Sequence, residues 1–126
     1  MIISTVRIQP SPNKLRETLE ILYWLQAPTI AQPGCALRRV CLEQSPELAV
    51  ILWEEWETET DLKRHVRSEL YSWVLAAQEL SARAPEIAFY GIAETRGIEL
   101  IQELRACRSN GARTSPSIRG ALDECL

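Results

Sequence analysis

Apolar and polar residues alternate along the first part of the chain, which predicts a strand over residues 2–9. The pattern then changes to apolar positions spaced three and four residues apart, which predicts a helix over about 12–26. Ser11 and Pro12 have the chemistry of an N-cap and of a first helical residue. Pro28 is expected to end this helix.

Two further strands are predicted next along the chain. One covers Cys35–Glu43, and the other is a strongly apolar stretch over Leu48–Trp56. In the second of these, both alternating sets of side chains are apolar as far as Glu54. Both faces of this strand are therefore expected to be covered by other parts of the protein.

The following residues predict more helix and one more strand. Thr58 and Asp61 have the spacing of a capping box, which predicts the start of a helix that carries His65. A second helical stretch covers about 70–80, and alternation returns over 86–94, which predicts a fourth strand.

The element order is β-α-β-β-α-β, which predicts an α+β fold, a ferredoxin-like antiparallel sheet with its helices on one face. The predicted helices are too few to cover both faces of such a sheet. A second copy of the chain, packed sheet to sheet, covers the open face most simply, so the pattern predicts a homodimer. We expect one ferredoxin-like domain over 1–96, followed over 97–126 by a short helix and a loose tail.

Composition and charge exclude two classes of partner. The 126 residues include 14 Lys and Arg against 17 Asp and Glu, a net charge of −3, so the positive excess that nucleic acid requires is missing. The longest uncharged stretch, 21–37, is shorter than the about 20 apolar residues of a membrane span and contains proline and glycine. The first residues lack the basic region and cleavage site of a secretory signal, and we expect a cytoplasmic protein.

The residues that bind metals and cofactors form no recognisable motif. His65 is the only histidine, and the four cysteines have no CxxC spacing with which to build a zinc site. The sequence also has no GxGxxG or P-loop motif. We therefore expect no metal, flavin or haem cofactor. The cysteines are expected to be free thiols, buried except in the tail, namely Cys35, Cys41, Cys107 and Cys125.

One stretch, WEEWETETDLKRH over 53–65, joins a strand that ends in aromatic and acidic residues to a helix with the pattern Leu-x-x-His. It resembles the antibiotic biosynthesis monooxygenase family, small dimeric α/β-barrel proteins in which a strand ending Tyr-Glu-x-Trp precedes an acidic turn and a helix ending Leu-x-x-His. Trp53 stands where the family usually has tyrosine or another aromatic residue. The other matching positions are Glu54, Glu55, Trp56, Leu62 and His65.

The resemblance implies oxygenation of a small aromatic quinol or polyphenol without metal or bound flavin, in a pocket between the sheet and the helices. Such chemistry needs a base and donors that hold the phenolate oxygen. Histidine is the side chain that changes charge near neutral pH, so His65 is the candidate catalytic residue. The aromatic residues expected to line the pocket are Trp53, Trp56, Tyr71, Trp73 and Tyr90.

Simpler interpretations stand beside each of these assignments. His65 is also interpreted as a hydrogen-bonded packing residue, the tryptophans as core or dimer contacts, and most of the acidic run as a solvated turn. Arg38 and Arg39, on opposite faces of their strand, are expected to bind an anionic substrate or the partner's acidic run.

Haem degradation is disfavoured by the resemblance itself. The first strand has Thr5 and Arg7 where haem-degrading relatives have an asparagine, and 71–80 contains no histidine. The alternative to a monooxygenase is a non-catalytic dimeric module that binds a ligand or associates with a pathway.

Overall fold

The computed structural model describes residues 1–109 of the chain. The chain divides into two compact units, residues 1–93 and residues 94–126, and each is described by itself. The tail that the sequence predicts to be loose lies, from residue 110 onward, outside the described residues.

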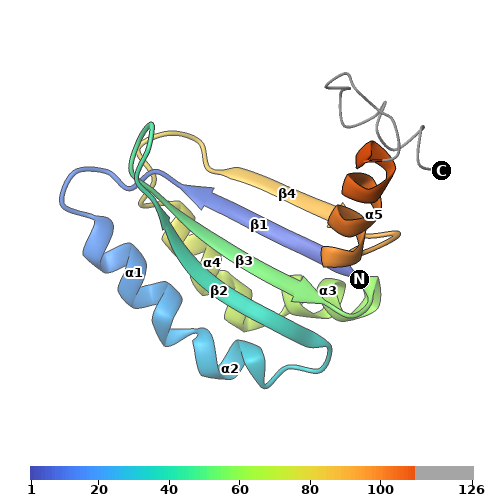
Figure 1. Cartoon of the computed structure of the whole chain (residues 1–126). Helices are drawn as coiled ribbons and strands as arrows, with labels where there is room; N and C mark the ends of the chain where they lie inside the picture. Colours follow the sequence, from blue (N-terminus) through green and yellow to red (C-terminus); the bar gives the residue numbers. More distant parts are fainter. Residues whose placement is uncertain (110–126) are drawn as a thin grey trace. The chain divides into compact units, whose positions relative to one another are not determined.

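The first unit is built on a four-stranded antiparallel sheet in the order β2-β3-β1-β4. Its strands are β1 (Ile2–Ile8), β2 (Cys35–Glu43), β3 (Ala49–Trp56) and β4 (Glu86–Gly91), and Figure 1 shows β1 and β3 in the centre with β2 and β4 at the edges. This order confirms the predicted α+β, ferredoxin-like fold. Within one chain the sheet is open and does not close into a barrel.

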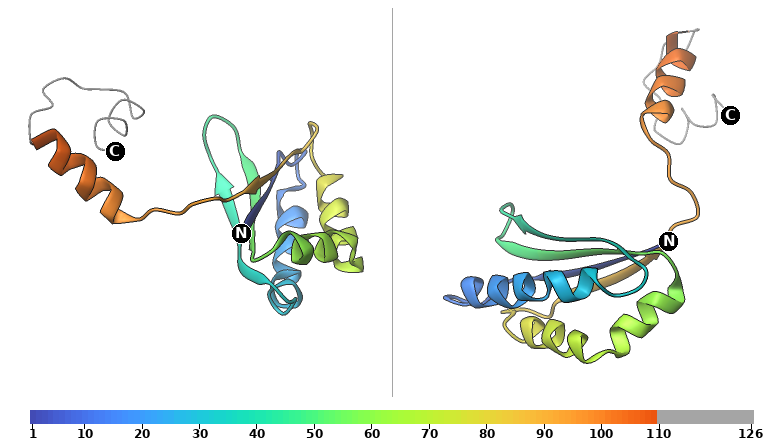
Figure 2. Two further views of the ribbon diagram at one scale, coloured as in Figure 1. Left: turned by 90° about the vertical axis from the view of Figure 1, so that its right-hand side faces the viewer. Right: turned by 90° about the horizontal axis from the view of Figure 1, so that it is seen from below.

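Helices cover one face of this sheet. They are α1 (Leu15–Trp24), α2 (Gln26–Ile30), α3 (Glu59–Arg67) and α4 (Glu69–Gln78), and they lie together on one side of the strands in Figure 2. The buried core fills the space between, with side chains from β1, β3, α1 and α4: Val6, Ile8, Leu22, Leu25, Val50, Leu52, Tyr71, Val74 and Ala77.

The two faces of β3 differ in what covers them. Val50 and Leu52 point toward the helices and are buried, whereas Ile51 and Trp53 lie on the other face and are only partly buried. Among residues 1–93, no helix covers that second face (Figure 2). The predicted apolar, uncovered sheet face is therefore present.

The start of the first helix differs from the prediction. α1 begins at Leu15, because Asn13 adopts a left-handed conformation with φ of 68° that no helix continues through. Lys14 is the N-cap and makes no side-chain capping bond, so the expected roles of Ser11 and Pro12 are wrong. Pro28 does not end the helical segment; it lies in the first turn of α2, where a missing backbone N–H is tolerated.

The second unit contains α5 (Ile98–Ser109), where the sequence predicts a shorter helix. Cys107, on this helix, is disulfide-bonded, so the expectation of free thiols is wrong for that residue. Cys35 and Cys41 are free, but Cys41 is exposed rather than buried. Cys125 lies outside the described residues.

The described residues contain neither a membrane-spanning helix nor a metal-binding cluster. No helix within residues 1–109 is long and apolar enough to cross a membrane. Over the same residues, no group of three or more His, Cys, Asp or Glu side chains could hold a metal ion.

Candidate functional site

A cluster of buried polar and aromatic side chains lies between the sheet and the short helices α2 and α3. Arg38 comes from β2, Glu54 and Trp56 from β3, His65 from α3 and Tyr71 from α4. All of them are buried, and Glu54 and His65 are each only 1% exposed. His65 is the only histidine in the sequence, and it lies here beside the carboxylate of Glu54.

Strand periodicity explains why charged residues enter this interior. Glu54 lies between Leu52 and Trp56 on the side of β3 that faces the helices, so all three are buried. Arg38 lies directly opposite Glu54 in the pairing of β2 with β3. Two opposite charges are thus placed side by side on the covered face.

The local structure of α3 points His65 toward the same place. Thr58 caps the helix, accepting a hydrogen bond from the backbone N–H of Asp61 at 3.1 Å, as the sequence predicts. Leu62 and His65, three residues apart, form the buried side of this short helix. The cap therefore fixes the register that brings the imidazole to the sheet.

Glu54 lies between an arginine and a histidine. Its Oε2 accepts a hydrogen bond from Arg38 Nε at 3.2 Å, and its Oε1 lies 3.4 Å from His65 Nε2. Arg38 also donates from Nη1 to Gln26 Oε1 at 2.7 Å. Burial lowers the pKa of the Arg38 guanidinium, and the negative charge of Glu54 opposes that shift. Arg38 and Glu54 therefore form a buried ion pair, and the histidine lies against the same carboxylate.

The His65 ring is held on every side that the structure describes. Trp56 stacks on it with ring centroids 4.6 Å apart, and Tyr71 meets it edge-on at 5.4 Å. Its Nδ1 lies 2.6 Å from Gln32 Oε1. With Gln32 at one ring nitrogen and Glu54 at the other, the orientation of the imidazole is fixed.

Some hydrogen-bonding capacity of this cluster is unused. Among the described residues, Arg38 Nη2, Trp56 Nε1 and His65 Nε2 are buried nitrogen atoms without a hydrogen-bond partner. A buried group left in this state costs about 1–3 kcal/mol. The described part of the protein therefore leaves these three nitrogen atoms of the cluster without a hydrogen bond.

Tyr71 keeps its proton at neutral pH. Burial raises the pKa of its phenol, and the negative charge of Glu54 raises it further. The hydroxyl group therefore stays neutral beside the histidine.

The aromatic residues predicted to line one pocket lie in three different places. Trp56 and Tyr71 contact His65. Trp53 and Tyr90 instead line a hollow of about 320 Å³ on the open sheet face. Trp73 lies on the outer helix surface, edge-on to Trp24 at 5.5 Å. Only two of the predicted pocket residues are therefore near the candidate base.

The enclosure of His65 matters for any catalytic role. The ring does not line the hollow on the open sheet face, nor those on the outer helix surface. A substrate therefore reaches it only after neighbouring side chains move, and this agrees with the packing interpretation of His65.

Several members of the cluster are not predicted from the sequence. Most of the acidic run is predicted to be a solvated turn, but Glu54, its first residue, is buried. Arg38 is predicted to contact a substrate or a partner's acidic run, and in the structure it pairs with Glu54 inside one chain. The alternation of Leu52, Glu54 and Trp56 could have revealed the burial of Glu54, whereas nothing in the sequence marks Gln32.

Comparison with known proteins decides the family. Residues 1–77, more than half of the chain, match the family model described as antibiotic biosynthesis monooxygenase. The chain belongs to the antibiotic biosynthesis monooxygenase family. The matched region of this family member runs from β1 into α4 and includes the whole polar cluster around His65. No curated protein matches the sequence.

Solved structures agree with this family assignment at the level of the fold. A conserved protein from Methanosarcina mazei Go1 is 26% identical, with a TM-score of 0.66, over 71% of this chain and 89% of its own. A Mycobacterium tuberculosis protein is 20% identical, with a TM-score of 0.68, over 76% and 98%. A candidate antibiotic biosynthesis monooxygenase from Deinococcus radiodurans is 20% identical, with a TM-score of 0.69, over 78% and 98%.

Proposed function

We propose that this family member is a monooxygenase that oxidises a small aromatic quinol or polyphenol without a metal or organic cofactor. The observation that carries the proposal is the position of His65, between the rings of Trp56 and Tyr71 and 3.4 Å from the carboxylate of Glu54. A histidine beside a buried carboxylate and flat aromatic walls suits the removal of a proton from a phenol.

The proposed chemistry starts with proton transfer. His65 accepts the phenolic proton, and the charge of Glu54 stabilises the resulting imidazolium. The electron-rich phenolate ring then reduces dioxygen. One oxygen atom enters the ring as a carbonyl and the other leaves as water, so a phenol with a free ring position becomes a quinone and the substrate supplies the electrons.

In this proposal, Arg38 and Trp56 donate hydrogen bonds to the phenolate oxygen. Their Nη2 and Nε1 atoms are buried donors without a partner among the described residues. Such donors stabilise the phenolate oxygen without reorganising during the reaction. The sheet-facing side of α3 must move outward to admit the substrate, because His65 is enclosed.

The open sheet face supports a proposed homodimer. Ile51, Trp53 and Ile3 lie on this face, and a second copy packed against it would bury them. The two sheets then form the barrel that the family resemblance implies. Each copy keeps its own His65 cluster on the opposite side of its sheet.

Dioxygen consumption tests the proposed reaction. The wild type and His65→Gln are assayed across a panel of hydroquinones and naphthols, with Trp73→Phe as a control remote from His65. We expect His65→Gln to lose turnover by about 100-fold or more, the low end for general acid–base catalysis, while the control keeps it. Unchanged turnover in a folded His65→Gln would contradict the assignment of the base.

The second candidate function is a non-catalytic module that binds a small aromatic ligand. The observation that favours it is the complete enclosure of His65 and Glu54, each 1% exposed. In that case the panel gives saturable binding of a naphthol with no consumption of dioxygen by the wild type.

A further inference from the structure

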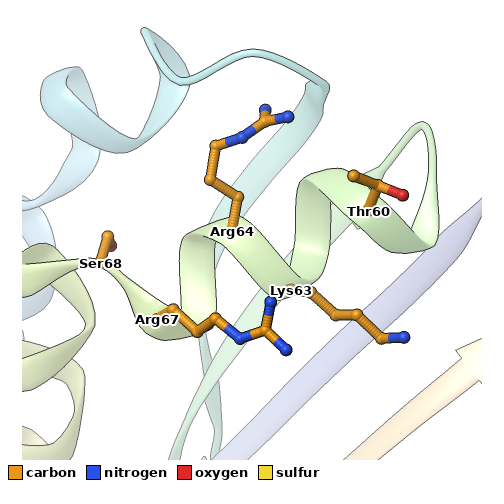
Figure 3. Close-up of a pocket in the computed structure, with 5 residues that line it drawn as sticks. All are labelled: Thr60, Lys63, Arg64, Arg67 and Ser68. Carbon is orange, nitrogen blue, oxygen red and sulfur yellow. The ribbon is translucent and has the colours of Figure 1, made fainter.

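The outer side of α3 carries a group of basic residues that the proposed function does not use. Lys63, Arg64 and Arg67 lie on exposed positions of this helix. With Thr60 and Ser68 they line a hollow of about 690 Å³ (Figure 3). The same helix carries two acidic residues beside these three cations, so its formal charge is +1 in a chain with a net charge of −3.

A second, more apolar hollow shares two of these cations. It has a volume of about 410 Å³ and its apolar wall consists of Leu62, Val66 and Phe89. Lys63 and Arg67 line both hollows, and the carboxylate-bearing Glu59 lines the second one as well. In Figure 3 these two side chains extend along one side of α3, whereas Arg64 extends away from them. The cations therefore form a charged rim beside an apolar surface.

The apolar surface is exposed because β4 is an edge strand. Val66 is 38% exposed and Phe89 is 49% exposed, although both are large hydrophobic residues. β4 pairs only with β1 in the described sheet, so Phe89 lacks a strand neighbour on its outer side. A contiguous exposed apolar patch with a polar rim is a feature of binding sites.

The three cations of the rim differ in whether an acidic side chain pairs with them. Lys63 contacts Glu59 at 3.2 Å and Arg64 contacts Asp61 at 3.0 Å, both as exposed pairs within one helix. Exposed pairs of this kind contribute only about 0–1 kcal/mol, so a ligand displaces them easily. Arg67 has no acidic partner within residues 1–109.

We propose that this rim binds a small amphiphilic anion. Its carboxylate contacts Arg67 and Lys63, and its aromatic or aliphatic body lies on Leu62, Val66 and Phe89. A guanidinium group suits this task because it binds a carboxylate through two parallel hydrogen bonds. The site lies on the outside of α3, while His65 points inward, so it is distinct from the proposed reaction site.

Binding of 2-naphthoate tests the proposal, with the uncharged 2-naphthamide as the matched ligand. Both are titrated into the full chain while backbone amide NMR signals are followed. We expect naphthoate to bind at least about tenfold more tightly than the amide and to shift the signals of α3 and Phe89. The Lys63→Gln/Arg67→Gln variant should bind naphthoate about tenfold more weakly, no better than the amide.

Two further variants test the roles of charge and of apolar contact separately. Arg16→Gln removes an exposed cation from α1 and should leave naphthoate binding unchanged. Val66→Ser should weaken naphthoate and naphthamide alike, because it alters the surface under the ligand body. Quinol turnover is measured separately, so loss of this site and loss of the proposed reaction are distinguishable.

The following outcomes would overturn the proposal. One is equal affinity for naphthoate and naphthamide, and another is full affinity in the double variant. Signal shifts confined to the hollow beside Trp24 and Trp73 would place the ligand elsewhere. Binding to phosphatidylglycerol vesicles without binding to naphthoate would assign this face to a lipid surface instead.

Discussion

Glu54 joins two side chains that could not otherwise remain buried together. Its carboxylate accepts from Arg38 and lies against His65, and the three come from β3, β2 and α3. An isolated charge in a protein interior is expensive, and pairing with good geometry offsets that cost. Glu54 therefore stabilises the folded site, whether or not a reaction takes place there.

The first prediction concerns this carboxylate. Glu54→Gln keeps the size of the side chain but leaves Arg38 as an uncompensated buried charge, so we expect the free energy of unfolding to fall by about 3–5 kcal/mol. Urea denaturation measures it. Glu55→Gln is the matched control, because Glu55 is the next residue on β3, lies on the open face and accepts a hydrogen bond from Trp53 Nε1. Equal destabilisation by the two variants would contradict the role of Glu54.

At this scale the sequence predicts some members of the site better than others. His65 and Trp56 are predictable because a recognisable helix cap and strand end place them. Trp73 follows an apolar helical pattern too, yet its side chain lies on the outer surface against Trp24. Local pattern does not determine which aromatic side chains meet across elements. The contact of Gln32 with His65 joins residues 33 positions apart, and no local pattern encodes it.

Among the elements, α3 depends on the loop that precedes β2. Gly34 has a φ of 84°, and its carbonyl accepts a hydrogen bond from the backbone N–H of Glu57 at 2.8 Å. A Cβ at this position would overlap the side chain of Asp61. Asp61 is part of the cap of α3, so the loop and the helix start fit against each other.

The second prediction follows from this close approach. Gly34→Ala forces a non-glycine residue into a left-handed conformation and displaces Asp61, so we expect a loss of about 1–3 kcal/mol in the free energy of unfolding. Gly91→Ala is the control, because nothing lies within 4 Å of the added Cβ and its φ is not positive. Chemical denaturation compares them, and a Gly34→Ala variant as stable as Gly91→Ala would contradict the steric argument.

The strands were easier to predict than the ends of the helices. β2 has the predicted bounds, Cys35–Glu43, because alternation changes abruptly where the chain turns. The first helix starts three residues later than predicted, because Asn13 takes a left-handed conformation that its side chain tolerates. Pro28 continues helical structure because it lies in the first turn of a new helix. The ends of these helices depend on where helical structure stops and starts again, and the spacing of apolar residues does not specify those positions.

For the whole molecule, the open sheet face raises the question of assembly. Arg7 crosses this face and pairs with Glu43 at 2.7 Å, so the charges on it are partly satisfied within one copy. The apolar residues on the same face have no cover within residues 1–93. We propose that a ferredoxin-like domain over 1–96 dimerises through this face and that 97–126 is an extension to it.

The third prediction tests that assembly. Ile51→Arg places a charge in the middle of the open face, while the buried Val50 beside it points into the core. We expect the proposed dimer to dissociate, because an unpaired charge buried between two copies is costly. Light scattering at micromolar concentration measures the mass. Leu75→Arg, an exposed position on α4, is the control and should remain dimeric; a monomeric wild type would contradict the proposal outright.

The four tryptophans lie in three different environments, so their fluorescence can report on each of these regions. Trp53 lies on the open sheet face, Trp56 in the interior against His65, and Trp24 and Trp73 at the outer helix surface. Indole fluorescence depends on the polarity around the ring, so each region of the first unit contains its own emitter. Three variants that each retain a different tryptophan environment would report covering of the sheet, opening of the His65 cluster and contact at the helices as separate spectra.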